Sequence, residues 1–204
     1  VDAPGAQWGR PTRDQVQMSL HAQLPVSVFA RLHGLHLTVV DCGVAENMPP
    51  HARLLARKVA HGTRNARTAL AMSVEQAHAG VRVGMEIADN LPGNVLACAG
   101  MGQGSAECAA LVLSRLADQP VRDFVVSGPT MRQDDLVHLL DVLHGAMARH
   151  RDARDPMDLL AAFGGYELAV MVGAMLVAAS KRSLIIVDGI AACAALKLAS
   201  LICA

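Results

Sequence analysis

The sequence predicts a helix-rich α/β fold, in which a mainly parallel sheet is flanked by helices in a Rossmann-like, three-layer arrangement. Short apolar runs that are typical of buried strands lie at residues 35–40, 94–98 and 184–187. Segments with helical periodicity separate these runs, and strands that alternate with helices favour parallel pairing. With 204 residues the chain can bury a sizeable core, and we expect residues 1–204 to form a single α/β domain.

Apolar residues at helical spacing mark the first predicted helix. It opens at Pro11-Thr12 with Pro25 as a kink, and its apolar positions are Val16, Leu20, Leu24 and Val28. The strand that follows ends at Asp41, and a turn at Gly43 closes it. We therefore expect one kinked helix and one strand before the middle of the chain.

Capping residues and glycine-rich turns mark the remaining elements. Ser73 and Gln76 have the spacing of a capping box and predict a helix to about Ala88. Pro156 suits the first turn of a later helix, which is expected to break at Gly164-Gly165. Further helices are expected at 106–116 and at 191–203, with a short strand at 124–126. Asp134 is expected to cap another helix, which reaches about His150.

Charge and hydropathy exclude two classes of partner. Equal numbers of basic and acidic residues, 18 of each, leave no net charge and remove the electrostatic basis for binding nucleic acid. The apolar stretch 168–179 is shorter than the roughly 20 residues that a membrane span needs. We therefore expect the chain to bind neither nucleic acid nor a membrane.

The cysteines and histidines show no spacing typical of a metal site or a disulfide framework. The five cysteines are widely spaced and contain no Cys-x-x-Cys pair, and the nine histidines lack His-x-x-x-His spacing. Free cysteines in apolar runs behave as small hydrophobic side chains. We expect no metal, no cofactor and a reducing, cytoplasmic compartment.

A glycine-rich turn, Gly100-Met101-Gly102-Gln103-Gly104, is the strongest local indication of a ligand. It joins a predicted strand to a predicted helix, so unpaired backbone N–H groups and the positive end of the helix meet there, which suits a phosphate. The pattern differs from the dinucleotide fingerprint and has no Walker lysine. The alternative is a tight turn that permits close packing of helix against strand.

Three acidic residues occupy positions where a role in a site and a structural role are both open. Asp41 and Asp188 follow strands. Each either recognises ribose, an amide or a cation, or serves as a turn carboxylate. Glu167 follows Gly164-Gly165 in an apolar helix and is either a site residue or a partner of Arg182.

A series of motifs follows a fixed order along the chain: Pro11 to Met18, Val39-Val40-Asp41-Cys42-Gly43-Val44-Ala45, Gly62-Thr63-Arg64-Asn65, Ala71-Met72-Ser73, Gly102 with Gly104, Asp155-Pro156-Met157, Gly164-Gly165-Tyr166-Glu167 and Val187-Asp188-Gly189. In this order they resemble the motifs of the nicotinate-nucleotide–dimethylbenzimidazole phosphoribosyltransferase family of cobalamin biosynthesis. The resemblance runs through nearly the whole chain, which would be the core part of a longer family fold.

The resemblance implies an activity, substrates and a homodimer. The reaction would transfer phosphoribosyl from nicotinate mononucleotide to 5,6-dimethylbenzimidazole, giving α-ribazole 5′-phosphate and nicotinate. Gly102 and Gly104 match the phosphate-side loop of the family, and Gln17 and Met18 match its base-binding helix. The other substrate-binding positions that the resemblance implies are Asp188, Gly189 and Gly128.

Two departures from the family pattern bear on activity. Gly100 stands where the loop of the family has a glutamate, and the G-E-G-S-G motif with the catalytic glutamate of the family is not among these 204 residues. The catalytic residue is therefore unassigned. Two alternatives stay open: a non-catalytic relative that binds a nucleotide or base, and a structural partner subunit.

Overall fold

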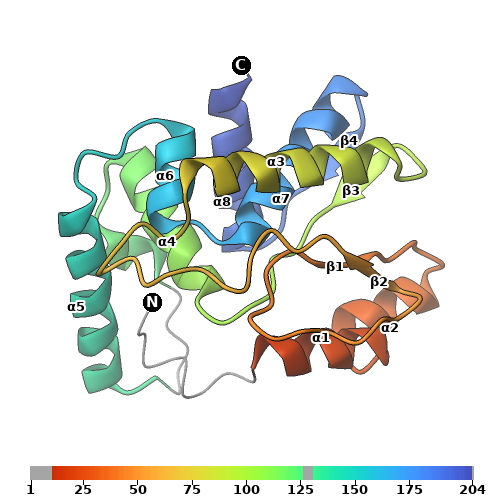
Figure 1. The fold of residues 1–204 in the computed structure, drawn as a ribbon, viewed down its shortest axis with the longest axis horizontal. Coiled ribbons are helices and arrows are strands. Elements are labelled where there is room, and N and C mark those ends of the chain that lie inside the picture. Colours follow the sequence, from red (N-terminus) through yellow and green to blue (C-terminus); the bar gives the residue numbers. More distant parts are fainter. Residues whose placement is uncertain (1–10, 126–130, 204) are drawn as a thin grey trace.

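The computed structural model describes residues 11–125 and 131–203 (Figure 1). In chain order its elements are α1 (Thr12–Leu20), α2 (Pro25–Leu32), β1 (Val39–Asp41), β2 (Leu54–Ala56), α3 (Val74–Asp89), β3 (Val95–Ala97), α4 (Ser105–Ala117), the 3₁₀ helix η2 (Val121–Phe124), α5 (Gln133–Arg149), α6 (Pro156–Phe163), α7 (Tyr166–Ser180), β4 (Leu184–Ile186) and α8 (Ile190–Ile202). Helices dominate this order, so the predicted helix-rich α/β class is confirmed.

The strands pair in parallel, as the alternation with helices predicts. β1 pairs with β2, with Val39 opposite Leu54, and β3 pairs with β4, with Val95 opposite Leu184. The described strands form two separate two-stranded ladders and not one continuous sheet. Figure 1 shows one ladder beside α1 and α2 and the other at the far side from α5.

The main core lies among the helices, with α7 near its centre. Ten of the 15 residues of α7 are buried, including Leu168, Val172 and Met175. The largest fully buried side chain is Phe163, at the end of α6. None of the helices in the described ranges is long and apolar enough to cross a membrane.

Helices α3 and α7 cross so closely that glycine is required on both (Figure 1). A Cβ atom at Gly84 would overlap the carbonyl oxygen of Val170, and one at Gly173 would overlap that of Val81. Each helix thus presents a glycine to the backbone of the other. Larger side chains at either position would force the two helices apart.

Several predicted helix boundaries are confirmed by their caps. Ser73 accepts a hydrogen bond from the Gln76 backbone N–H at 3.1 Å, and the Gln76 side chain accepts one from the Ser73 N–H at 2.9 Å. Asp155 caps α6, whose first turn contains Pro156. The predicted break at Gly164-Gly165 separates α6 from α7.

Three local predictions are wrong. The kinked helix after Pro11 is two helices, because a turn with Ala22 in the left-handed region separates α1 from α2, and Pro25 starts the second. Residues 121–124 form a 3₁₀ turn in place of the strand expected at 124–126, of which Val126 lies outside the described residues. Asp134 lies in the first turn of α5, and Arg132 is its N-cap.

Strand β2 has no signature in the sequence and was not predicted. It contains only three residues, between Arg53 and Arg57, and shows no alternation of apolar and polar side chains. This segment is a strand because it pairs with β1, whose residues lie 15 positions earlier in the sequence.

Candidate functional site

Two loops lie side by side at the carboxyl ends of β3 and β4. The pairing places Ala97 opposite Ile186, so the chain leaves both strands at the same edge. A Cβ atom at Gly100, in the first loop, would lie 3.1 Å from the Cβ of Ala191 at the start of α8. The loops therefore bring the starts of α4 and α8 to one edge, where ligands bind in open α/β sheets.

Glycine is the N-cap of both helices at this edge. Gly104 precedes α4 with φ +79°, and Gly189 precedes α8 with φ +80°. Because glycine has no side chain, neither N-cap residue accepts a hydrogen bond from the N–H groups in the first turn of its helix. Two helix N-termini at one edge attract an anion such as phosphate.

The predicted residues Gly102, Gly104, Asp188 and Gly189 all belong to these two loops. Asp188 is exposed and lies two residues after the end of β4. Gly128, the remaining glycine of the prediction, lies outside the described residues.

Helix α1 contacts the glycine loop at its own start. The Gln103 backbone N–H donates to Thr12 Oγ1 at 3.1 Å, and Met101 packs against a small apolar cluster that includes Val16 and Leu20. Gln17 and Met18 lie on the same helix and are half-buried. The structure thus places the predicted base-binding helix against the predicted phosphate loop.

Glu167 reaches the same loop from the first turn of α7. Its Oε1 accepts a hydrogen bond from Ser105 Oγ at 2.9 Å, and Ser105 is the first residue of α4. Burial raises the pKa of Glu167, while its own backbone N–H and the Ser105 hydroxyl act in the opposite direction. Arg182 is exposed beyond the other end of α7, so the alternative of a Glu167–Arg182 pair is wrong.

The Glu167 carboxyl group influences the pKa of two thiols, the half-buried Cys42 and the buried Cys108. Burial raises the pKa of Cys42, which follows β1, and of Cys108, in α4, to about 12 each, and Glu167 adds to both increases. Both cysteines are therefore neutral near pH 7.

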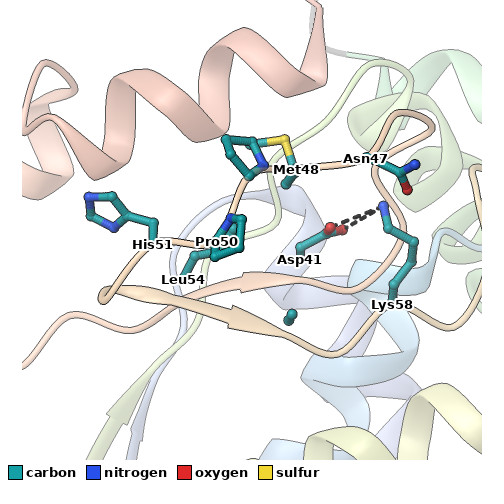
Figure 2. Close-up of a pocket in the computed structure, with 9 residues that line it drawn as sticks. Asp41, Asn47, Met48, Pro50, His51, Leu54 and Lys58 are labelled. Carbon is teal, nitrogen blue, oxygen red and sulfur yellow. Dashed lines mark hydrogen bonds and ion pairs between the residues drawn. The ribbon is translucent and has the colours of Figure 1, made fainter.

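Asp41 is a turn carboxylate with a cationic partner. Its Oδ1 accepts hydrogen bonds from the N–H groups of Gly43, at 3.1 Å, and Val44, at 2.9 Å. Lys58 Nζ lies 3.0 Å from Asp41 Oδ2 (Figure 2). The same ammonium group donates to the carbonyl groups of Val44 and Glu46. The structural interpretation of Asp41 is therefore confirmed.

A hollow of about 280 Å³ lies beside this pair, at the ends of β1 and β2. Its lining residues are Asp41, Asn47, Met48, Pro49, Pro50, His51, Leu54, Ala56 and Lys58 (Figure 2). The charges of Asp41 and Lys58 are engaged with each other and with backbone groups. What remains for a ligand is chiefly the apolar wall of Met48, Pro50 and Leu54.

The polar residues that join these segments are the ones that sequence reasoning missed. The sequence marks Thr12 only as a helix start and Ser105 only as the end of the glycine turn, and it gives no indication of Lys58. Each forms its contact with a residue distant in sequence, so no local pattern marks it. The one signal that could have been used is the position of Ser105 directly after the glycine turn.

Comparison with known proteins agrees with this arrangement. The family model described as "Phosphoribosyltransferase" matches residues 6–204. The nicotinate-nucleotide–dimethylbenzimidazole phosphoribosyltransferase of Variovorax paradoxus is 41% identical over 188 residues, which are 92% of this chain and 54% of the relative. The enzyme of the same name from Cupriavidus taiwanensis is 40% identical over 191 residues, covering 92% of this chain and 55% of the relative.

A solved structure shares the fold. The crystal structure of CobT from Thermus thermophilus matches with a TM-score of 0.88 and 28% identity, over 94% of this chain and 59% of that one. The chain spans just over half the length of the curated relatives that it matches. With its ordered motifs, its loops at the β3–β4 edge and a family match over residues 6–204, the chain belongs to the nicotinate-nucleotide–dimethylbenzimidazole phosphoribosyltransferase family.

Proposed function

We propose that the chain serves phosphoribosyl transfer from nicotinate mononucleotide to 5,6-dimethylbenzimidazole, which yields α-ribazole 5′-phosphate and nicotinate. The observation that carries this proposal is the pair of glycine-capped helix starts, α4 and α8, at the carboxyl edge of β3 and β4. The names of the relatives support the choice of substrates.

In this proposal the β3–β4 edge receives the nucleotide. Backbone N–H groups near Gly102 and Gly104 bind the phosphate, since helix N-termini stabilise a dianion without requiring a lysine. Asp188 and Gly189 follow the adjacent strand and approach the ribose of the nucleotide from the other loop. Gly128 is a further proposed contact, carried by the family resemblance alone.

The acceptor base lies on the side of α1 in this proposal. Gln17 offers an amide for hydrogen bonds and Met18 an apolar, polarisable surface for a flat ring. The contact between Thr12 and the glycine loop supports this placement, because it fixes α1 beside the nucleotide. The proton released by the acceptor nitrogen needs a base within hydrogen-bond reach, and the catalytic residue stays unassigned.

Product analysis tests the proposal. The chain is incubated with nicotinate mononucleotide and dimethylbenzimidazole, products are identified by mass spectrometry, and nucleotide binding is measured by calorimetry. We expect nicotinate and α-ribazole 5′-phosphate in equal amounts. If the chain binds the nucleotide but forms no product, its role is non-catalytic binding and not transfer. If it neither binds the nucleotide nor forms product, the proposal is overturned.

A pair of glycine variants tests whether the nucleotide binds at the glycine loop. Gly104→Ala and Gly93→Ala both place a side chain at a positive φ, +79° and +90°, and neither Cβ would meet another atom within 4 Å. The backbone strain is therefore comparable, but only Gly104 lies in the proposed phosphate loop. We expect Gly104→Ala to weaken nucleotide binding and Gly93→Ala to leave it unchanged; equal effects would contradict the placement.

We also propose that the chain forms a homodimer in the cytoplasm, as the family resemblance implies. Helix α2 supports self-association, because it exposes Val26, Phe29 and Leu32 on its surface. The cysteines, free throughout the described residues, support a reducing compartment. Sedimentation velocity should give twice the 21.4 kDa chain mass, and a monomer at micromolar concentration would contradict the dimer.

A single-domain organisation over residues 1–204 is part of the same proposal. One apolar cluster contains residues from α3, α4, α6, α7 and α8, which supports a common core. Thermal unfolding should then show one cooperative transition. Two separated transitions would contradict it.

A further inference from the structure

We propose that Glu167 is a positioning residue: through the Ser105 hydroxyl it holds the glycine loop and the first turn of α4 in the conformation that receives the phosphate. That the loop binds a phosphate rests on the proposed function. That Glu167 fixes the conformation of the loop rests only on the contacts of Glu167.

Ser105 connects Glu167 to the backbone of the glycine loop. Its Oγ donates to Glu167 Oε1 at 2.9 Å, across 62 positions of sequence. Its backbone N–H donates to the Gly102 carbonyl at 3.3 Å and so closes the turn. A single buried residue, 8% exposed, therefore joins the loop to the carboxyl group of α7.

Two glycines leave the space that this hydrogen bond occupies. A Cβ atom at Gly165 would overlap the Glu167 carboxylate. A Cβ at Gly100 would lie 3.2 Å from Ser105 Oγ and 3.1 Å from the methyl carbon of Met171, closer than ordinary van der Waals contact. Side chains at these two positions would displace one partner or the other, so the backbone is shaped to fit the pair.

Among the described residues, few groups stabilise the charged form of Glu167. Its own backbone N–H and the Ser105 hydroxyl favour the charged form, and burial opposes that form. Cys42, which follows β1, and Cys108, in α4, are influenced by the Glu167 charge but are neutral thiols near pH 7 and offer it no compensating charge. The Ser105 hydrogen bond is therefore one of the few favourable contacts of this group, and breaking it costs more than a surface hydrogen bond would.

The alternative is that Glu167 only stabilises the start of α7, as an acidic residue in a first turn does. Glu75 provides the matched control, because it is the second residue of α3 as Glu167 is the second residue of α7. Glu75 is exposed and lies far from the glycine loop in sequence. Equivalent substitutions at the two positions separate the effect on a helix start from the effect on the loop.

The experiment measures amide hydrogen exchange and nucleotide binding in Glu167→Ala, Glu167→Gln, Ser105→Ala and Glu75→Ala. We expect Glu167→Ala and Ser105→Ala each to raise exchange at residues 102–105 by about tenfold, the loss of one buried hydrogen bond. Glu167→Gln keeps an acceptor oxygen and should stay near the wild type. The double variant Glu167→Ala with Ser105→Ala should add little to either single change, because both remove the same contact.

The outcomes separate this inference from the proposed function. Unchanged exchange at residues 102–105, or an increase spread evenly over all helices, overturns the positioning role. The wild-type chain could fail to bind nicotinate mononucleotide while Glu167→Ala and Ser105→Ala still raise exchange at residues 102–105. In that case the proposed function is wrong and the positioning role of Glu167 is retained. If Glu167→Ala does not fold, Ser105→Ala, which removes a single hydroxyl, decides the question by the same two readouts.

Discussion

Asp41 and Glu167 are inward-facing carboxylates that are stabilised in different ways. Asp41 is paired with Lys58 and accepts two backbone hydrogen bonds, so its charge is compensated. Glu167 has a hydroxyl and a backbone N–H, and burial raises its pKa. At the scale of single residues, we therefore expect removal of the two carboxylates to have different consequences.

Removal of the Asp41 carboxylate should destabilise the fold strongly. Asp41→Ala leaves the largely buried Lys58 without its partner, and two N–H groups without an acceptor, which costs about 3–5 kcal/mol in comparable buried pairs. Asp89→Ala removes an exposed ion pair with Lys181 and should cost below about 1 kcal/mol. Urea unfolding at pH 7 measures both, and equal costs would show that the Asp41 pair is not a buried one.

Glu167 should make stability depend on pH. Because its pKa is raised on folding, the folded state holds the proton more tightly than the unfolded state. This contribution is fully present below the ordinary value of 4.5 and is lost as pH rises through the raised value. The free energy of unfolding of the wild type should therefore fall relative to that of Glu167→Gln as pH rises from about 4 to neutrality. A constant difference across that range would show that burial does not raise the pKa of this carboxyl group.

At the scale of elements, the sequence predicts those helices and strands whose ends are determined by contacts between neighbouring residues. The start of α3 follows from Ser73 and Gln76, and that of α6 from Asp155 and Pro156, because each cap is made within four residues. Strand β2 depends on pairing with β1, which no local pattern encodes. The 3₁₀ turn at 121–124 has β-branched and aromatic residues that favour a strand, but no described strand lies beside it to pair with.

The crossing of α3 and α7 supplies a prediction at this scale. Gly173→Ala places a Cβ atom on the Val81 carbonyl oxygen, so the helices must separate, and we expect a loss of about 2 kcal/mol or more. Gly145→Ala, in the C-terminal part of α5, meets only the Arg67 side chain at 3.4 Å. There the lower backbone entropy of alanine should stabilise by about 0.5–1 kcal/mol. Thermal unfolding that shifts in the same direction for both variants would contradict the close helix crossing as the cause.

At the scale of the whole molecule, the site is assembled from four segments distant in sequence. The glycine loop and the end of β4 were predictable, because strand, turn and helix start are encoded locally around Gly104 and Gly189. The approach of Thr12 and of Glu167 was not, because it depends on how α1 and α7 pack. The ordered motifs indicate the family, and some of them lie in these four segments, but they do not reveal which residues are in contact.

Amide chemical-shift mapping with nicotinate mononucleotide would locate the bound nucleotide without requiring turnover. We expect saturable shifts centred on residues 102–105 and 189–191, at the starts of α4 and α8, which inorganic phosphate reproduces in part. Amides near His51, beside the apolar hollow, should shift little. Shifts centred on that hollow or on α5, or no saturable shifts at all, would contradict a nucleotide site at the β3–β4 edge.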